Sequence, residues 1–148
     1  MPHPQYAHMA AALVDVPAGF ALDRLTDAGF IGGWALGSMG LQPVGGGVWR
    51  GTSLFDGAES HIEIHPQPAL GLIDFAVGSA ESRSPRIFLR VTSGPLLGHG
   101  ADCCLVTLHA LRPAQATAER WARTCTTHET EILLIKAQLE AALAGMTP

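Results

Sequence analysis

The chain contains few charged residues, and arginine supplies nearly all of its positive charge. Charged side chains make up 15% of its 148 residues, against about 25% in an average globular protein. Lysine occurs once, at Lys136, and the formal net charge at pH 7 is -4. Such a chain offers no basic face to nucleic acid and no polybasic segment to an anionic membrane surface. We therefore predict no nucleic-acid partner.

Long apolar runs are missing as well, and cysteine is scarce. No apolar run approaches the roughly 20 residues of a membrane-spanning helix, and the run over 9–14 is too short for the core of a signal peptide. The three cysteines include the neighbours Cys103 and Cys104, whose adjacency disfavours a disulfide between them. We expect reduced thiols, no integral membrane association and a cytoplasmic location.

The last quarter of the chain carries a pattern typical of a long amphipathic helix. Seven mostly apolar positions follow one another at alternating steps of four and three residues: Trp121, Cys125, His128, Ile132, Ile135, Leu139 and Ala142. This spacing places all seven on one stripe of a helix. We predict that helix over residues 114–144.

Upstream of this helix, the pattern is the alternation of β-strands. Alternating runs cover 61–65, 72–77, 86–91 and 104–108, with turn residues between them, and a shorter apolar run over 11–16 predicts a first strand. The segment 37–47 contains five glycines and is interpreted as a loop. The intervals between strands are too short for crossover helices, which favours an antiparallel meander. The predicted fold class is α+β, a helix-grip fold in which a curved antiparallel sheet wraps around a long C-terminal helix.

Several local strings in this order resemble the START-like superfamily, also called SRPBCC, which includes polyketide cyclases, lipid-transfer domains and pollen-allergen-like proteins. These strings are Val14 to Ala18, Leu25 to Asp27 with Trp34, Ser53 to Gly57, Leu72 to Gly78 and His128 to Ile132. The resemblance covers roughly residues 11–144. It implies a hydrophobic pocket between sheet and helix. It implies no reaction, because the superfamily has no common catalytic residues. We predict a flexible tail over 1–10 and a single START-like ligand-binding domain over 11–148.

The stripe and the apolar strand faces predict the lining of that pocket. The expected ligand-binding residues are Trp34, Ile62, Ile64, Ile73, Phe75, Leu89, Trp121, Cys125, His128 and Ile132. His128 is the polar member of the stripe. Its imidazole could orient a ligand carbonyl or act as a general acid or base, and a core histidine bonded to a strand carbonyl is the alternative.

Three further groups of residues are candidates for chemistry. Cys125 and His128 are three residues apart, which permits a thiolate–imidazole pair, although a buried cysteine usually acts as a small hydrophobe. The polar residues of the strand over 61–65 are expected to face water. Its two histidines would be about 13 Å apart, too far for one metal ion. The arginines could hold an anionic group at the cavity mouth or pair with carboxylates on the wet face of the sheet; they are Arg83, Arg86 and Arg90.

The predicted function is the binding of a small hydrophobic molecule, such as a lipid, a polyketide or an isoprenoid-like compound. One alternative is a polyketide cyclase or dehydratase that uses His128 as acid or base without a metal ion. The polar strand residues Asp74 and Arg90 alternate outward, so no second inward polar group is evident to support it. The other alternative is a co-chaperone-like interaction domain. We predict no cofactor and no bound metal, and either a monomer or a homodimer.

Overall fold

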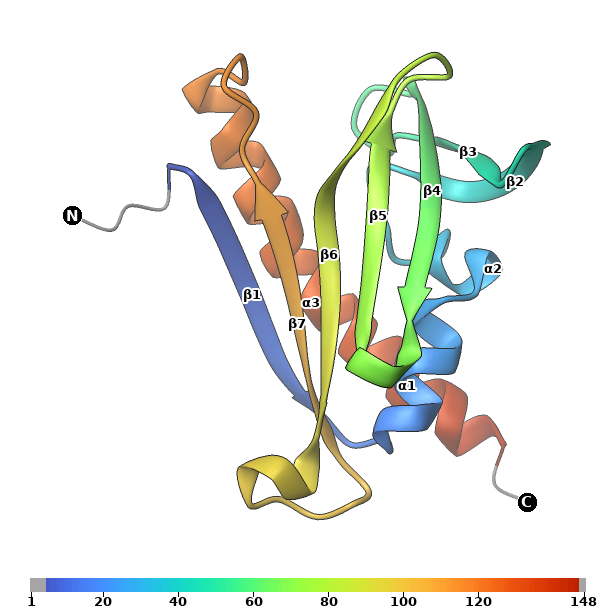
Figure 1. Cartoon of the computed structure of the whole chain (residues 1–148), viewed down its shortest axis with the longest axis vertical. Helices are drawn as coiled ribbons and strands as arrows, with labels where there is room; N and C mark the ends of the chain where they lie inside the picture. The colour runs from blue at the N-terminus through green and yellow to red at the C-terminus, as the bar shows by residue number, and fades with distance from the viewer. Residues whose placement is uncertain (1–4, 147–148) are drawn as a thin grey trace.

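The computed structural model describes residues 5–146 as a curved sheet with one long helix against it (Figure 1). The elements in chain order are β1 (Ala7–Val14), α1 (Ala18–Leu25), α2 (Ala28–Ile31), β2 (Met39–Gly45), β3 (Val48–Thr52), β4 (Glu59–Gln67), β5 (Leu72–Gly78), β6 (Arg83–Ser93), β7 (Cys104–Leu111) and α3 (Ala118–Gly145). Short 3-10 turns, η1 (Pro68–Leu70) and η2 (Gly94–Leu97), follow β4 and β6. No helix within the described residues is long and apolar enough to cross a membrane.

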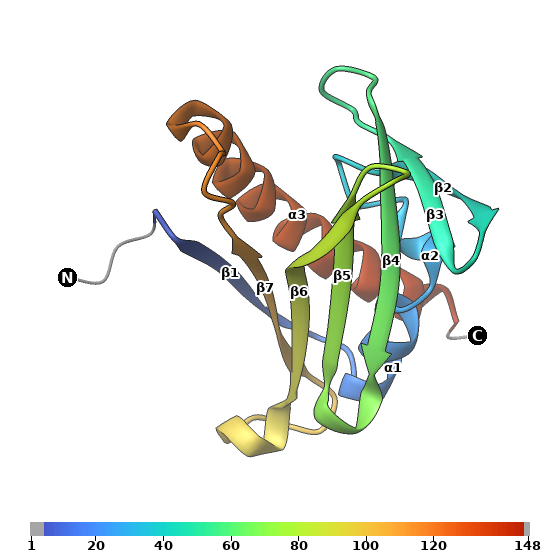
Figure 2. The ribbon, with the colours of Figure 1, turned by 45° about the horizontal axis from the view of Figure 1, so that its top comes forward.

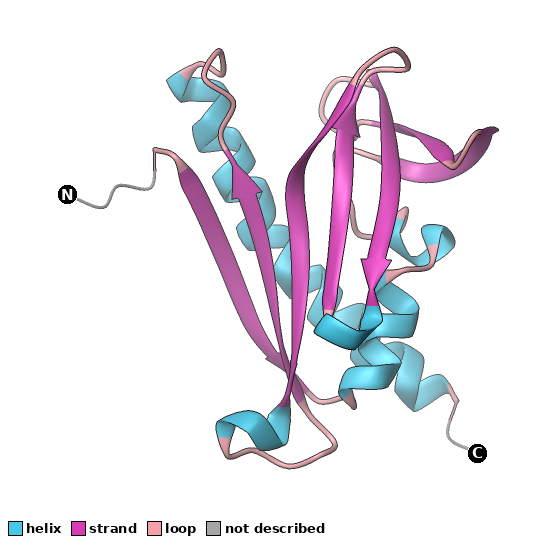
Figure 3. Cartoon of the chain, in the orientation of Figure 1, coloured by secondary structure: helices cyan, strands magenta, loops and turns pink. Residues whose placement is uncertain are grey.

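The sheet has seven strands in the order β1-β7-β6-β5-β4-β3-β2, and the neighbouring strands are antiparallel. Strands β2 to β7 form a meander, and β1 closes the other edge by pairing with β7. The secondary-structure view separates this sheet from the helices (Figure 3). The predicted α+β helix-grip fold is confirmed.

Helix α3 lies across one face of the sheet, which curves around it (Figure 2). The inward positions of the central strands alternate with outward ones, so the sheet buries one row of apolar side chains per strand. On the helix, the large apolar residues that meet the sheet are Ile132, Ile135 and Leu139, all of them buried. The core therefore sits under the C-terminal half of α3.

Three predicted boundaries are wrong. Strand β1 begins at Ala7, so residues 7–10 are paired with β7 and are not part of a flexible tail; residues 1–4 lie outside the described residues. The segment predicted as a loop over 37–47 contains β2, whose glycines are tolerated because it is an edge strand with an irregular register. Helix α3 begins at Ala118 and not at Ala114, because Thr117 caps it by accepting a hydrogen bond from the Arg120 N–H at 3.1 Å.

A β-bulge interrupts the alternation of β6. Phe75 pairs with Ile87 and Ala76 pairs with Pro85, so Arg86 is the extra residue of β6 at this point. A bulge moves the residues on one side of it to the opposite face. As a result, Arg86 leaves the outward face that simple alternation predicts for it and lines the inner face beside Ile87.

The buried seam of α3 can be tested with two leucines on the same helix. Leu139 is fully buried at 0% exposure, whereas Leu133 is 63% exposed. We expect Leu139→Ala to lower the free energy of unfolding by about 2–5 kcal/mol, because it removes methyl groups and leaves a cavity. Leu133→Ala should change it by about 0.5 kcal/mol or less. Urea unfolding measures both, and equal losses would contradict the assignment of the seam.

Candidate ligand-binding site

A cavity of about 410 Å³ lies between the sheet and the N-terminal half of α3; we call it the main cavity. A second pocket of about 390 Å³ adjoins it near the start of α3. The two share Val77, Gly78, Arg86, Ile87, Arg120 and Thr124 in their linings, so they are direct neighbours, and together we call them the hollow.

One wall of the main cavity is apolar. Trp34 and Phe75 meet edge to face, with ring centroids 6.5 Å apart and an interplanar angle of 76°. The other large apolar residues of this wall are Ile31, Ile62, Ile87 and Leu108. Because they come from α2, β4, β6 and β7, the wall exists only once sheet and helices have assembled.

The opposite wall, on α3, carries two buried ionisable side chains. Glu131 and His128 are only 5% and 4% exposed, and His128 Nε2 lies 3.7 Å from Glu131 Oε1. The other carboxylate oxygen of Glu131 accepts a hydrogen bond from the Leu36 backbone N–H at 2.8 Å. The segment 32–38 is also held to α3 by Gln138 Nε2, which donates to the Gly33 carbonyl at 3.0 Å. Helix α3 thus fixes the segment that carries Trp34.

Burial favours the uncharged form of each of these two side chains. It raises the pKa of Glu131 to about 7, although the hydrogen bond from Leu36 acts in the opposite direction. Burial, with a smaller contribution from the nearby His8, lowers the pKa of His128 to about 4. Near neutral pH, His128 is therefore an uncharged imidazole, and Glu131 can either donate or accept a proton.

Two of the residues that line the main cavity, one on each wall, have a ring nitrogen without a hydrogen-bond partner among the described residues. These nitrogens are Trp34 Nε1 and His128 Nδ1, both buried. A buried polar atom without a partner costs free energy, and a water or a ligand oxygen ordinarily relieves that cost. Next to them in the lining, the hydroxyls of Ser38 and Ser60 are 2.7 Å apart and bond to each other. The main cavity therefore combines an apolar wall with a set of polar side chains that makes up about half of its lining residues.

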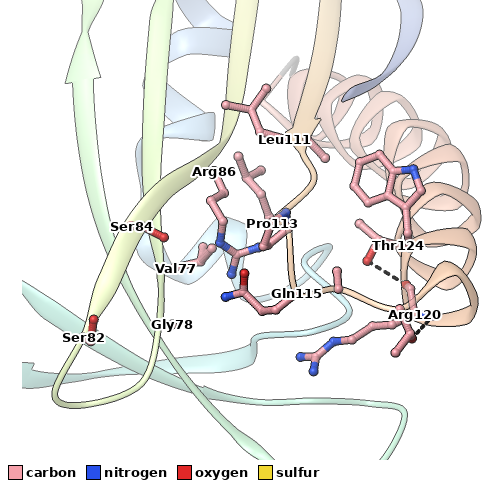
Figure 4. Close-up of a pocket in the computed structure, with 15 residues that line it drawn as sticks. Val77, Gly78, Ser82, Ser84, Arg86, Leu111, Pro113, Gln115, Arg120 and Thr124 are labelled. Carbon is pink, nitrogen blue, oxygen red and sulfur yellow. Dashed lines mark hydrogen bonds between the residues drawn. The ribbon is translucent and has the colours of Figure 1, made fainter. Parts of the chain in front are cut away.

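The second pocket also combines apolar and polar residues (Figure 4). Arg86 from β6 and Arg120 from α3 extend toward the same opening, and Gln115 from the β7–α3 connection projects into it as well. Burial lowers the pKa of Arg86, and the positive charge of Arg120 lowers it further. The second pocket therefore places two cations close to each other.

The structure brings together only part of the predicted lining. Trp34, Ile62, Phe75 and His128 line the main cavity, and Trp121 lines the second pocket. Neither lining includes Ile64, Ile73, Leu89, Cys125 or Ile132. Of these, Ile73, Leu89 and Ile132 are core residues.

Cys125 does not pair with His128 in the described structure. The thiol is partly buried, and burial together with the nearby Glu129 raises its pKa, so it is held as a thiol. A nucleophilic thiolate needs the opposite shift. Cys125 acts here as a small side chain at the edge of the helix interface.

The polar strand residues behave as expected for the outer face. Glu63 accepts a hydrogen bond from Arg83 Nε at 2.6 Å and lies 3.2 Å from His65 Nε2. Arg90 is exposed. No group of three or more potential metal-ligating side chains occurs within residues 5–146. Of the three arginines considered from sequence, only Arg86 reaches the hollow.

Sequence reasoning missed Glu131 and Arg120. Glu131 lies three residues after His128, so it borders the same stripe, and an acidic residue at that border was the available signal. Arg120 lies one position before the stripe begins at Trp121. The inward turn of Arg86 had a weaker signal in Pro85, since proline inside a strand often marks an edge or a bulge.

The buried pair predicts opposite pH profiles for two variants. Folded Glu131 binds a proton between about pH 4.5 and 7 that the unfolded chain has released, so its contribution to stability falls as pH rises. Folded His128 stays unprotonated between about pH 4 and 6.5 while the unfolded chain binds a proton, so its contribution rises with pH. In the wild type the two slopes largely cancel.

We therefore expect Glu131→Gln to gain stability relative to wild type as pH rises from 4.5 to 7. His128→Gln should lose stability relative to wild type over pH 4 to 6.5. Each change should be on the order of 1–3 kcal/mol. Urea unfolding at a series of pH values measures them, and two profiles parallel to that of wild type would contradict the burial of the pair.

Comparison with known proteins shows similarity of structure and none of sequence. No family model matches the chain, and no curated protein matches it. The Aha1 dimer from Colwellia psychrerythraea is 13% identical with a TM-score of 0.66, and the match covers 90% of this chain and 96% of that chain. The di-domain ARO/CYC BexL from the BE-7585A biosynthetic pathway is 16% identical with a TM-score of 0.68, over 95% of this chain and 48% of that chain.

DynU16, from the dynemicin biosynthetic locus, is 17% identical with a TM-score of 0.60, over 97% of this chain and 48% of that chain. The chain therefore spans about half the length of BexL and of DynU16. At these identities the likeness concerns the fold alone. The chain shares the helix-grip fold with these proteins.

Proposed function

We propose that this protein binds a small hydrophobic molecule carrying at least one oxygen atom, in the main cavity between the sheet and α3. The observation that supports the proposal is a cavity with one apolar wall, whose lining includes Trp34 and His128, each with a buried ring nitrogen that has no hydrogen-bond partner among the described residues. Small-molecule sites are typically apolar hollows of about 300–1,000 Å³ with a few placed polar groups. The main cavity has that size, and its apolar wall lies opposite the polar side chains of α3.

The polar groups would orient the ligand. The indole N–H of Trp34 can only donate a hydrogen bond, so it fits a carbonyl or hydroxyl oxygen. His128 is uncharged near neutral pH and can donate or accept according to its tautomer. Apolar contact with Phe75, Ile62 and Leu108 would supply most of the binding free energy. A lipid, polyketide or isoprenoid-like compound with one oxygenated end has this chemistry.

The structural neighbours support this proposal at the level of the fold. BexL is an ARO/CYC, and membership of the SRPBCC superfamily is part of what we propose for this chain. A homodimer has the Aha1 dimer as its support, and a co-chaperone-like role has only the shared fold. They rest on the fold alone, so we rank them below ligand binding.

A fluorescent apolar probe tests the cavity directly. N-phenylnaphthylamine (NPN) is neutral and fluoresces in apolar surroundings, and we expect it to bind the wild-type protein. Gly37 lines the main cavity, and a Cβ at this position would meet no atom within 4 Å, so Gly37→Phe should occupy part of the space without disturbing the backbone. We expect that variant to bind NPN at least about tenfold more weakly.

The matched control is Gly19→Phe in α1, where an added Cβ also meets no atom within 4 Å and no pocket is nearby among those described. It should bind NPN as the wild type does. Absence of binding to the wild type, or equal affinity in Gly37→Phe, would contradict the proposed function.

Glu131 favours a second candidate function, that of an enzyme catalysing enolisation, as a cyclase or dehydratase requires. A carboxyl group that exchanges its proton near pH 7 stands 3.7 Å from a neutral imidazole in the same cavity wall. The Glu131 carboxylate, the stronger base of the two, would take a proton from the carbon next to a ligand carbonyl, while the N–H of the neutral His128 imidazole donates a hydrogen bond to the carbonyl oxygen. The C–H electron pair becomes the C=C bond of the enolate and the carbonyl π pair moves onto the oxygen, so protons and electrons balance.

Deuterium exchange of benzylacetone in heavy water, followed by NMR, tests this candidate with a ketone that enolises slowly by itself. We expect the wild-type protein to accelerate exchange. Glu131→Gln or His128→Ala should lower the acceleration about 100-fold, the usual contribution of a general acid or base. The exposed Glu119→Gln is the control and should match the wild type. Exchange at the rate of the buffer, or no loss in the Glu131 variant, would remove this candidate.

A further inference from the structure

Arg86 and Arg120 line both the main cavity and the second pocket, at the place where these two adjoin. Arg86 comes from the bulge in β6 and is half-buried, and Arg120 comes from the first turn of α3. Neither guanidinium forms an ion pair with a carboxylate within the part of the chain that the structure describes. Other arginines nearby are already engaged: Arg83 binds Glu63, and Arg123 lies over the Phe55 ring at 5.6 Å.

Three positive contributions meet at this place, and the acidic residue of the same helix turn, Glu119, forms no ion pair with either arginine within the described residues. Two are the guanidinium charges, which act on each other. The third is the N-terminus of α3, where a helix presents the positive end of its dipole and normally favours acidic side chains. Arg120 lies in that first turn. Like charges brought together in a partly dehydrated place destabilise each other, and an anion between them would reverse that effect.

The surroundings suit the charged end of an amphipathic molecule. Gln115 projects into the second pocket beside Arg86 (Figure 4), and Ser84 and Thr124 add hydroxyl groups to the lining. Val77 and Ile87 line the second pocket and the main cavity alike, so an apolar surface runs from one to the other. A single molecule can therefore place an anionic group by the arginines and an apolar body against Phe75 and Trp34.

We propose that Arg86 and Arg120 form an anion-binding subsite, and that the ligand of this protein is an organic anion with an apolar body and a carboxylate or phosphate end. This inference rests on the proposed function, because the main cavity would hold the apolar body. Arginine is suited to such an end, since its planar guanidinium makes paired hydrogen bonds to two oxygens of one anion.

Two probes with the same ring skeleton separate the subsite from the cavity. Anilinonaphthalenesulfonate (ANS) carries a sulfonate, whereas NPN is the same skeleton without it. We expect the wild type to bind ANS more tightly than NPN. Arg86→Gln and Arg120→Gln should each weaken ANS binding about tenfold, as expected for the loss of one charge-assisted hydrogen bond, and should weaken NPN binding much less, because NPN carries no sulfonate.

Arg90→Gln is the matched control. Arg90 lies four residues from Arg86 on the same strand, is exposed, and lines neither the main cavity nor the second pocket. It should bind ANS as the wild type does. Equal losses for both probes, unchanged ANS binding in the Arg86 and Arg120 variants, or the same loss in Arg90→Gln would overturn the subsite. Failure of NPN to bind at all would contradict the proposed function instead.

A second measurement uses the wild-type protein and an anion without an apolar body, so it depends neither on binding in the main cavity nor on whether a variant folds. Titration of the wild type with inorganic phosphate, observed by NMR at the arginine Nε–H groups, should shift the signals of Arg86 and Arg120 and leave that of Arg90 in place.

Arg86→Gln should unfold at the same or a higher urea concentration than wild type, because it relieves the repulsion between the two arginines. Absence of the phosphate shifts, or a large loss of stability in Arg86→Gln, would show that Arg86 serves the fold and would overturn the proposal.

Discussion

The contact between the C-terminal half of α3 and the sheet is the constraint on which the rest of the structure depends. Ile132, Ile135 and Leu139 are large, apolar and buried, and they hold the helix close to the sheet. Apart from Trp121, which is buried beside the second pocket, the N-terminal half presents mainly threonine and arginine to the hollow, and these side chains are too short or too polar to fill the space. The helix is straight enough to span both halves, so a hollow remains where the filling residues stop.

Glu131 and His128 stand at the border between the filled and the hollow parts. Glu131 performs two tasks there, since one carboxylate oxygen holds the Leu36 backbone and the other lies near His128. A hydrogen bond to the backbone fixes the side chain in place, while burial keeps its proton exchangeable near neutral pH. The same residue thereby links the position of the Trp34 segment to the chemistry of the cavity wall.

Periodicity predicted the elements that bury a regular apolar face. Alternation predicts the meander, and the four-and-three spacing between Trp121 and Ala142 predicts the terminal helix. The structure contains both elements. Periodicity predicted His128 but not the other buried polar residues of the hollow. Glu131 is polar by type and buried only because Leu36 satisfies it, a contact between residues 95 positions apart. The inward turn of Arg86 depends on one extra residue in a strand, which leaves no trace in a two-residue period.

The bulge in β6 decides whether Arg86 lies inside or outside the hollow. The charge of the hollow therefore depends on the register of this strand as well as on which residues the sequence contains. Without the bulge, the residues of β6 on one side of it would exchange faces, and Arg86 would turn toward solvent with its sequence neighbours unchanged. A helix-grip protein could thus remove one positive charge from its hollow by losing one residue from a strand. The length of β6, rather than any substitution in the cavity wall, is then a determinant of which molecules this architecture admits.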